Sequence, residues 1–281
     1  MDLLFKNATV LTMDDAFPVV TGADVGIENG KIVFVRKRGA SSDEIKSKRI
    51  IDGAGKVLMP GLYNCHTHAS MSLLRGFAND LALEDWLFNH IFPAEKKLTP
   101  RIVYTGTMLA IAEMVASGTV AFTDMYFFMD EVARAAHDSG VLANVCNAVI
   151  GLDKNSYDFY EDKVCEQTKR VVEDYHKKGD GRIKAEASIH SVYTSYAPAW
   201  RQVLEFAGKH GLDLHIHLSE TAVENANCMA AYGMTPAMVF ERHGVLEKTA
   251  VAGHGVHLTD EDLDVLAERN VSVAHCPVSN L

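Results

Sequence analysis

The sequence after residue 57 alternates between short apolar segments and longer helical ones, and this alternation limits the fold most strongly. Seven strand-like segments are expected, at residues 57–65, 119–124, 142–149, 182–189, 213–218, 249–254 and 271–275. Helical segments separate them, including one that begins at Thr99-Pro100 and ends at Gly118. Strands connected by helices form parallel sheets. We therefore expect a (β/α)8 TIM barrel truncated after about seven strands, with an open doubly wound sheet as the alternative.

The first 57 residues show a different pattern, which is typical of a small β layer with a structural role. Strand-like runs are expected at residues 3–12, 24–28, 31–36 and 49–52. Asn29-Gly30 lies between two of these runs, and this pair favours a two-residue hairpin turn. The sequence thus predicts two domains, residues 1–57 and residues 58–281.

Composition and charge exclude several classes of partner. The net charge is −10 without a strong basic cluster, which argues against nucleic acid as the main partner. Five cysteines without a CxxC motif do not form a disulfide framework, so we expect a reducing, cytoplasmic location. The apolar stretch at 107–122 contains Glu113 and Gly118, and we therefore expect no membrane partner. A homo-oligomer is a possible assembly.

Two histidines lie at the end of the first barrel strand, in the motif His66-Thr67-His68. Residues two apart on a strand point to the same face, so the two imidazoles project together. Converging neutral imidazoles suit a transition metal. The alternative is a pair of structural histidines, one of them bonded to the backbone.

Polar residues also end most of the later strands. In chain order they are Asp124, Asn147, His190, His217, His254 and His275. The carboxyl ends of parallel barrel strands meet at one rim, where barrel enzymes carry their active sites. Histidines that gather there indicate a metal enzyme, since structural histidines would be scattered.

Four segments resemble the amidohydrolase superfamily. They are PGLYNCHTH (residues 60–68), HLSET (217–221), GHGVHL (253–258) and HCPVSNL (275–281). Within it they are similar to the 5-methylthioadenosine/S-adenosylhomocysteine deaminases and their guanine-deaminase and chlorohydrolase relatives. The resemblance implies a catalytic metal-dependent-hydrolase barrel plus a small β-sandwich domain, to which residues 1–57 contribute.

The resemblance also implies a set of catalytic roles. His66, His68 and His217 would hold one divalent metal ion, most simply Zn²⁺, which lowers the pKa of bound water. That water would attack the amino-bearing carbon of a purine nucleoside, with release of ammonia. Glu220 would be the proton shuttle, although a helix N-terminal carboxylate is its alternative role. His254 would orient the water, unless it is a core histidine.

Three further residues are candidates for substrate binding. Glu95 matches the family glutamate that binds ribose hydroxyls, and His190 matches a family histidine that contacts the nucleoside. Trp86 would line the mouth of the same substrate site. The alternatives are a buried aromatic role for Trp86 and a solvated position for Glu95. The third strand lacks the arginines that bind the homocysteine carboxylate in some members. A neutral substrate such as 5-methylthioadenosine is therefore favoured over S-adenosylhomocysteine.

Other functions were weighed against this one. A guanine or other amino-heterocycle deaminase, or a chlorohydrolase, would share the metal motifs, and a non-catalytic metal-binding fragment is a different class. A two-metal amidase would need a lysine at the end of the fourth strand, where the chain has His190. The family aspartate of the eighth strand is absent, so we expect an N-terminal fragment that is inactive when isolated.

Overall fold

The computed structural model describes residues 1–37, 45–153, 155–178 and 180–280. It divides into two compact units, Met1–Leu62 and Tyr63–Leu281. The domain boundary that we expect after residue 57 stays a prediction. Among the described residues, no helix combines the length and the apolar character that crossing a membrane requires.

The first unit is a five-stranded sheet. Its strands are β1 (Leu3–Leu11), β2 (Val19–Glu28), β3 (Lys31–Lys37), β4 (Arg49–Asp52) and β5 (Val57–Leu58). The order is β3-β2-β1-β4, and β5 also pairs with β1. The turn between β2 and β3 has positive φ at both Asn29 and Gly30, as the predicted hairpin requires. A small apolar core fixes the sheet, and its buried members are Ala8, Val10, Ala23 and Val25.

The second unit contains two four-stranded sheets with the orders β6-β7-β8-β9 and β10-β11-β12-β13. The first consists of β6 (Leu62–Thr67), β7 (Thr119–Tyr126), β8 (Leu142–Asn147) and β9 (Ile183–Ala185). The second consists of β10 (Ala187–Ile189), β11 (Leu214–Leu218), β12 (Thr249–His254) and β13 (Ser272–Ala274). The pairings β7–β8, β8–β9, β10–β11, β11–β12 and β12–β13 are all parallel. This arrangement is an incomplete (β/α) barrel, as predicted.

The segment expected to form one strand at 182–189 is divided into β9 and β10 at Glu186. The Glu186 N–H donates to the carbonyl of Val145 on β8 at 2.9 Å, whereas the next N–H, of Ala187, donates to Asp213 at 2.9 Å. The backbone therefore changes its pairing partner within one residue. Glu186 is left between the two sheets, with its side chain buried.

Helices connect the strands. They are η1 (Ala69–Leu74), α1 (Leu83–Asp85), η2 (Trp86–Ile91), α2 (Phe92–Glu95), α3 (Pro100–Ala116), α4 (Met129–Ser139), η3 (Phe159–Glu161), α5 (Lys163–Asp174), α6 (Ala197–His210), α7 (Ala222–Tyr232), α8 (Pro236–Arg242), α9 (Asp260–Glu268) and α10 (Pro277–Asn280). The predicted Thr99 cap is present, since its side chain accepts from the Ile102 N–H. The charged pattern over residues 157–178 predicts one long helix, and this prediction is wrong, because Asp162 caps α5 and separates it from η3.

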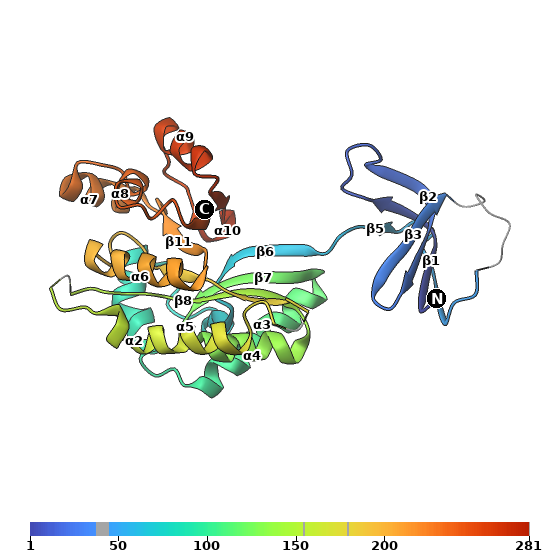
Figure 1. Cartoon of the computed structure of the whole chain (residues 1–281), viewed down its shortest axis with the longest axis horizontal. Coiled ribbons are helices and arrows are strands. Elements are labelled where there is room, and N and C mark those ends of the chain that lie inside the picture. The colour runs from blue at the N-terminus through green and yellow to red at the C-terminus, as the bar shows by residue number, and fades with distance from the viewer. Residues whose placement is uncertain (38–44, 154, 179, 281) are drawn as a thin grey trace. The chain divides into compact units, whose positions relative to one another are not determined.

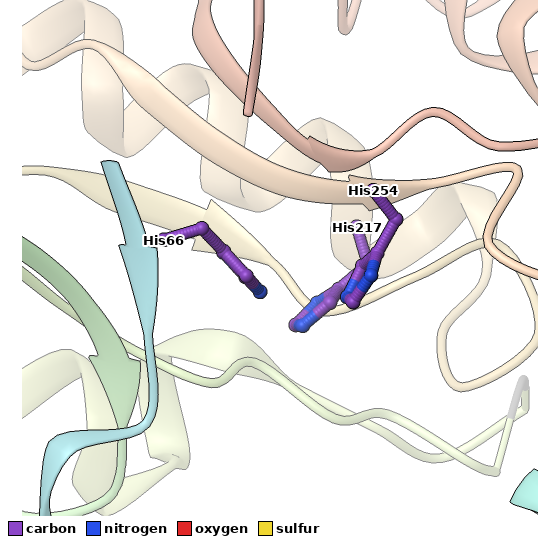
Figure 2. Close-up of side chains that lie close together, drawn as sticks. All are labelled: His66, His217 and His254. Carbon is purple, nitrogen blue, oxygen red and sulfur yellow. The ribbon is translucent and has the colours of Figure 1, made fainter. Parts of the chain in front are cut away.

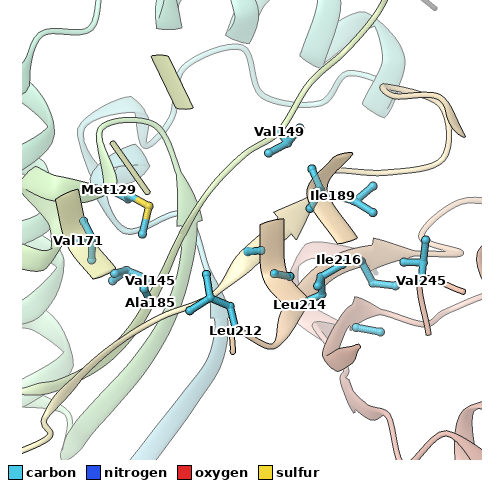
Figure 3. Close-up of a cluster of buried hydrophobic side chains, with 14 of the residues drawn as sticks. Met129, Val145, Val149, Val171, Ala185, Ile189, Leu212, Leu214, Ile216 and Val245 are labelled. Carbon is cyan, nitrogen blue, oxygen red and sulfur yellow. The ribbon is translucent and has the colours of Figure 1, made fainter. Parts of the chain in front are cut away.

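Helices α3, α4 and α5 follow one another along the same side of β7 and β8 (Figure 1). Every residue of β11 is buried, which is typical of a parallel strand covered on both faces. The apolar side chains between strands and helices form one continuous core, which includes Leu214, Ile216 and Val245 (Figure 3). This core fixes the strands whose carboxyl ends carry the candidate site.

Candidate metal centre and active site

Three strands of the second unit bring histidines together at one end of the barrel. His66 lies on β6, His217 on β11 and His254 at the end of β12. One ring nitrogen from each lies within 4.8 Å of the others. Figure 2 shows His217 and His254 side by side, with His66 pointing toward them from β6. His68 joins this group, because its Nε2 is 3.3 Å from the Nε2 of His217.

Hydrogen bonds fix the tautomers of two of these histidines. The Nδ1–H of His68 donates to the carbonyl of Met125 at 2.5 Å, and the Nδ1–H of His217 donates to the carbonyl of His190 at 2.8 Å. A carbonyl only accepts, so each Nδ1 carries the hydrogen and each Nε2 has a lone pair. Two lone pairs face each other across 3.3 Å. Ligands about 2.0–2.1 Å from a tetrahedral zinc ion lie about this far apart.

Burial keeps the imidazoles of the cluster neutral. It lowers the pKa of His68 to about 4 and that of His190 to about 3, and it also lowers the pKa of His66 and His217. The Nε2 of His66 is buried and has no hydrogen-bond partner among the described residues. The ring centre of His66 is 5.1 Å from that of His68 and 4.7 Å from that of His217, and an unpartnered buried ring nitrogen in such a cluster fits a cation and would be unfavourable without one. These three residues therefore fit the predicted metal.

A carboxylate and an amide lie against His254. Glu220 follows β11, and its Oε1 is 3.5 Å from the Nε2 of His254. The Oδ1 of Asn280 accepts from the Nδ1–H of His254 at 3.1 Å. Burial raises the pKa of Glu220 to about 7, and Asn280 opposes part of this rise. Glu220 can therefore take up and release a proton near neutral pH.

The backbone of His254 is held in an unusual conformation. Its φ is 74°, in the left-handed region that favours glycine. Such strain persists only where the surroundings fix it, and it is common at functional sites.

Two cavities meet at the histidines and bring together the predicted substrate residues. The larger has a volume of about 780 Å³ and is lined by His68, His217, Glu220 and His254, among others. The smaller, about 50 Å³, is lined by His68, Glu95 and Tyr126. Trp86 and His190 line both cavities. The predicted metal, catalytic and substrate residues other than His66 thus line one or both of these cavities.

Glu95 and His190 are held differently within the smaller cavity. Burial raises the pKa of Glu95 to about 7, and the nearby Tyr126 hydroxyl opposes part of this rise. The Nδ1 of His190 is 2.9 Å from the hydroxyl of Thr194, and its carbonyl accepts from the imidazole of His217. His190 therefore supports a metal candidate as well as lining the cavity. Lys184, the lysine of the fourth strand segment, is exposed on β9 and lines neither cavity.

Three residues of the site were not assigned roles from the sequence. Asp124 is buried on β7, and its Oδ1 accepts from the N–H of Ala69 at 2.5 Å, which fixes the backbone directly after His68. Gly253 lies beside His66, where a side chain would collide with the ring. Asn280 contacts His254 from α10. The position of Asp124 at a strand end was a signal for its role. Gly253 and Asn280 lie within the motifs GHGVHL and HCPVSNL, which indicated the site but no role for either residue.

The comparisons with known proteins agree with the motifs. The model of the amidohydrolase family matches residues 57–281, and the chain belongs to this family. It is 44% identical to a 5-methylthioadenosine/S-adenosylhomocysteine deaminase of Acetivibrio thermocellus, over the whole chain and 64% of the relative's length. It is 40% identical to a 5'-deoxyadenosine deaminase of Methanosarcina barkeri, over the whole chain and 63% of that relative. The chain thus spans somewhat less than two thirds of these curated relatives.

Solved structures show the same fold. An adenosine deaminase from Xanthomonas campestris with bound zinc is 33% identical and has a TM-score of 0.89, covering 99% of this chain and 63% of that one. A guanine deaminase from C. acetobutylicum with bound guanine has a TM-score of 0.83 at 22% identity, covering 99% of this chain and 68% of that one. At that identity the second likeness concerns the fold alone.

Proposed function

We propose that the protein hydrolytically deaminates adenosine-type nucleosides of the 5-methylthioadenosine class, in a reaction that depends on one divalent metal ion. The observation that carries this proposal is the pair of Nε2 lone pairs on His68 and His217, which face each other at 3.3 Å beside the buried carboxyl of Glu220. The relatives named as nucleoside deaminases support the substrate class.

His66, His68 and His217 hold the metal ion in this proposal, each through Nε2. Zinc is the first candidate, because three imidazoles are a common catalytic zinc set and the similar adenosine deaminase contains zinc. Such an ion lowers the pKa of bound water and so supplies hydroxide near neutral pH.

Glu220 moves the protons of the reaction. It accepts a proton from the attacking water and donates it to the ring nitrogen. It then accepts the proton of the new hydroxyl group on the ring carbon and donates it to the departing amino group, which leaves as ammonia. These transfers require a carboxyl that titrates near neutral pH. His254 lies 3.5 Å from Glu220 and is fixed on its other side by Asn280, so it can orient the water. Glu220 and His254, which both line the larger cavity, thus act together on the reacting atoms.

The substrate contacts follow from the lining of the two cavities. Glu95 can accept hydrogen bonds from the ribose hydroxyls, and Trp86 and His190 border the space for the purine. Neither of the cavities at the histidines is lined by an arginine or a lysine among the described residues. A neutral 5'-substituent therefore suits the site better than a homocysteine carboxylate, which would lack a cationic partner.

A substrate panel tests this proposal. Ammonia release and the change in absorbance are measured with 5-methylthioadenosine, adenosine, S-adenosylhomocysteine and guanine. We expect turnover of the first two, and a kcat/KM for S-adenosylhomocysteine that is lower by tenfold or more. Activity on guanine alone would refute the nucleoside assignment and indicate an amino-heterocycle deaminase. A cytoplasmic location and a homo-oligomeric state stay predictions from the sequence.

A further inference from the structure

A buried carboxylate and a buried histidine lie behind His66, on the side away from the proposed metal. His215 is on β11, two residues before His217, and is fully buried. Glu186 lies between β9 and β10 and is 6% exposed. Burying a charge in a barrel interior is costly unless it is paired, so the position of Glu186 needs an explanation.

The contacts run in one line from Glu186 to His66. Glu186 Oε1 accepts from the side-chain amide of Asn144 at 3.0 Å, and its Oε2 is 3.6 Å from the Nδ1 of His215. The Nε2 of His215 is 2.8 Å from the Nδ1 of His66. The ring centres of the two histidines are 5.0 Å apart. The Nε2 of His215 and the Nδ1 of His66 therefore lie on the line between the two ring centres. Along this line, an N–H of one ring points at the lone pair of the other, as in a hydrogen bond.

This line determines which nitrogen of His66 carries the hydrogen. Oε1 of Glu186 accepts from Asn144, and an Oε2 that likewise acts as an acceptor toward Nδ1 of His215 favours the His215 tautomer with its hydrogen on Nδ1. The Nε2 of His215 is then an acceptor, and the Nδ1–H of His66 donates to it. His66 is left with a lone pair on Nε2, the atom that is buried without a hydrogen-bond partner among the described residues.

The opposite arrangement is unfavourable at both ends. A hydrogen on Nε2 of His215 would leave a bare Nδ1 facing Glu186 Oε2 at 3.6 Å, and neither of these buried atoms has a hydrogen-bond partner among the described residues that could offset this. His66 would then carry its hydrogen on Nε2, which could not bind a metal. We propose that Glu186 and His215 are positioning residues that hold His66 in its metal-binding tautomer. This inference rests on the metal site proposed above.

Zinc affinity directly tests this relay, the chain of contacts from Glu186 through His215 to His66. The dissociation constant of zinc is measured by chelator competition in the full-length protein and in Glu186→Gln, whose amide can donate to His215 and favour the wrong tautomer. We expect the affinity to fall by about 10–100-fold. Thr168→Val is the matched control, because Thr168 is a buried polar residue on α5 that bonds to Asn147 and Val164 and not to the histidines. It should lower stability and leave zinc affinity unchanged.

Variants of His215 separate the relay from general packing. His215→Gln retains an acceptor for the Nδ1–H of His66 and should keep more zinc affinity than His215→Leu, which has none. In the His215→Leu background, Glu186→Gln should change zinc affinity by less than about twofold, because the connection is already broken. Additive effects in the double variant, or an unchanged affinity in Glu186→Gln alone, would overturn the proposal.

A second readout does not depend on zinc. Nitrogen-15 NMR of the metal-free protein reports the tautomer of each imidazole, and His66→Asn identifies the signals of His66. We expect Nδ1–H in the parent and a mixture of both tautomers in Glu186→Gln. If the parent bound no zinc, the proposed metal site would fail, and this spectrum would still decide the relay. A parent spectrum with the hydrogen on Nε2 of His66 would overturn it.

Discussion

Gly253 is the position at which a single methyl group should disturb the metal centre most. It lies on β12 opposite His217 in the strand register. A Cβ added there would lie 2.8 Å from Cε1 and 2.9 Å from Nδ1 of His66. Carbon atoms in contact normally lie about 3.5–4.0 Å apart, so the ring would have to move by roughly 1 Å. His215 also holds Nδ1 of this ring, at 2.8 Å, so the ring cannot move without disturbing that contact.

The expected effect of Gly253→Ala follows from that displacement. Functional sites need their groups within about 0.5 Å of the productive geometry, and a displacement of about 1 Å can cost about 10²-fold in rate. We expect zinc affinity to fall at least about tenfold and kcat/KM to fall about 10²-fold. Overpacking should also lower the free energy of unfolding by about 1–3 kcal/mol.

Gly208→Ala is the matched control for this variant. Gly208 lies on α6, and an added Cβ would meet no atom within 4 Å. Replacing a helical glycine by alanine should stabilise the protein by about 0.5–1 kcal/mol without affecting zinc. The assays are chelator competition, thermal unfolding and deamination of 5-methylthioadenosine. A Gly253→Ala protein with the zinc affinity and turnover of the parent would refute the close packing of His66.

Three further predictions concern carboxyl groups around the site. Glu220→Gln should lower the rate by about 10²–10⁴-fold at unchanged zinc content, and full turnover or loss of the metal would contradict the shuttle role. Burial raises the pKa of Glu95 from 4.5 to about 7, so its neutral form is favoured on folding. Its contribution to stability should therefore be present below about pH 4.5 and decline as the pH rises to about 7, by at most about 3 kcal/mol relative to Glu95→Gln. Urea unfolding of both proteins at several pH values measures this change, and a parent whose stability relative to Glu95→Gln stays constant or rises between pH 4.5 and 7 would contradict it. Asp124→Ala removes the acceptor of the Ala69 N–H and should lower the free energy of unfolding by about 1–3 kcal/mol, whereas an unchanged unfolding midpoint would show that this bond contributes little.

Much of the fold could be predicted from local sequence signals. The strands and helices after residue 57 follow from apolar periodicity and from caps such as Thr99, which the structure contains. The break at Glu186 could not be predicted, because it depends on which neighbouring strand accepts each backbone N–H. The interruption at Asp162 was visible as a capping residue, but the surrounding charged pattern favoured a continuous helix.

The candidate site could be predicted where polar residues lie at the carboxyl end of a strand. His66, His68, His190, His217 and His254 could be placed at one rim because parallel strands bring their carboxyl ends together. The residues that support them could not be predicted in this way. Gly253 matters through what a side chain would strike, and Glu186 and Asn280 matter through distances between segments far apart in the sequence.

The most direct test of the central claim is a crystal structure of the zinc-supplemented full-length protein with anomalous data at the zinc edge. The account predicts one strong anomalous peak within bonding distance of the Nε2 atoms of His66, His68 and His217, with Glu220 beside it but not bound to it. Two peaks at the site, a peak that excludes His68, or zinc bound through Glu220 would contradict the account.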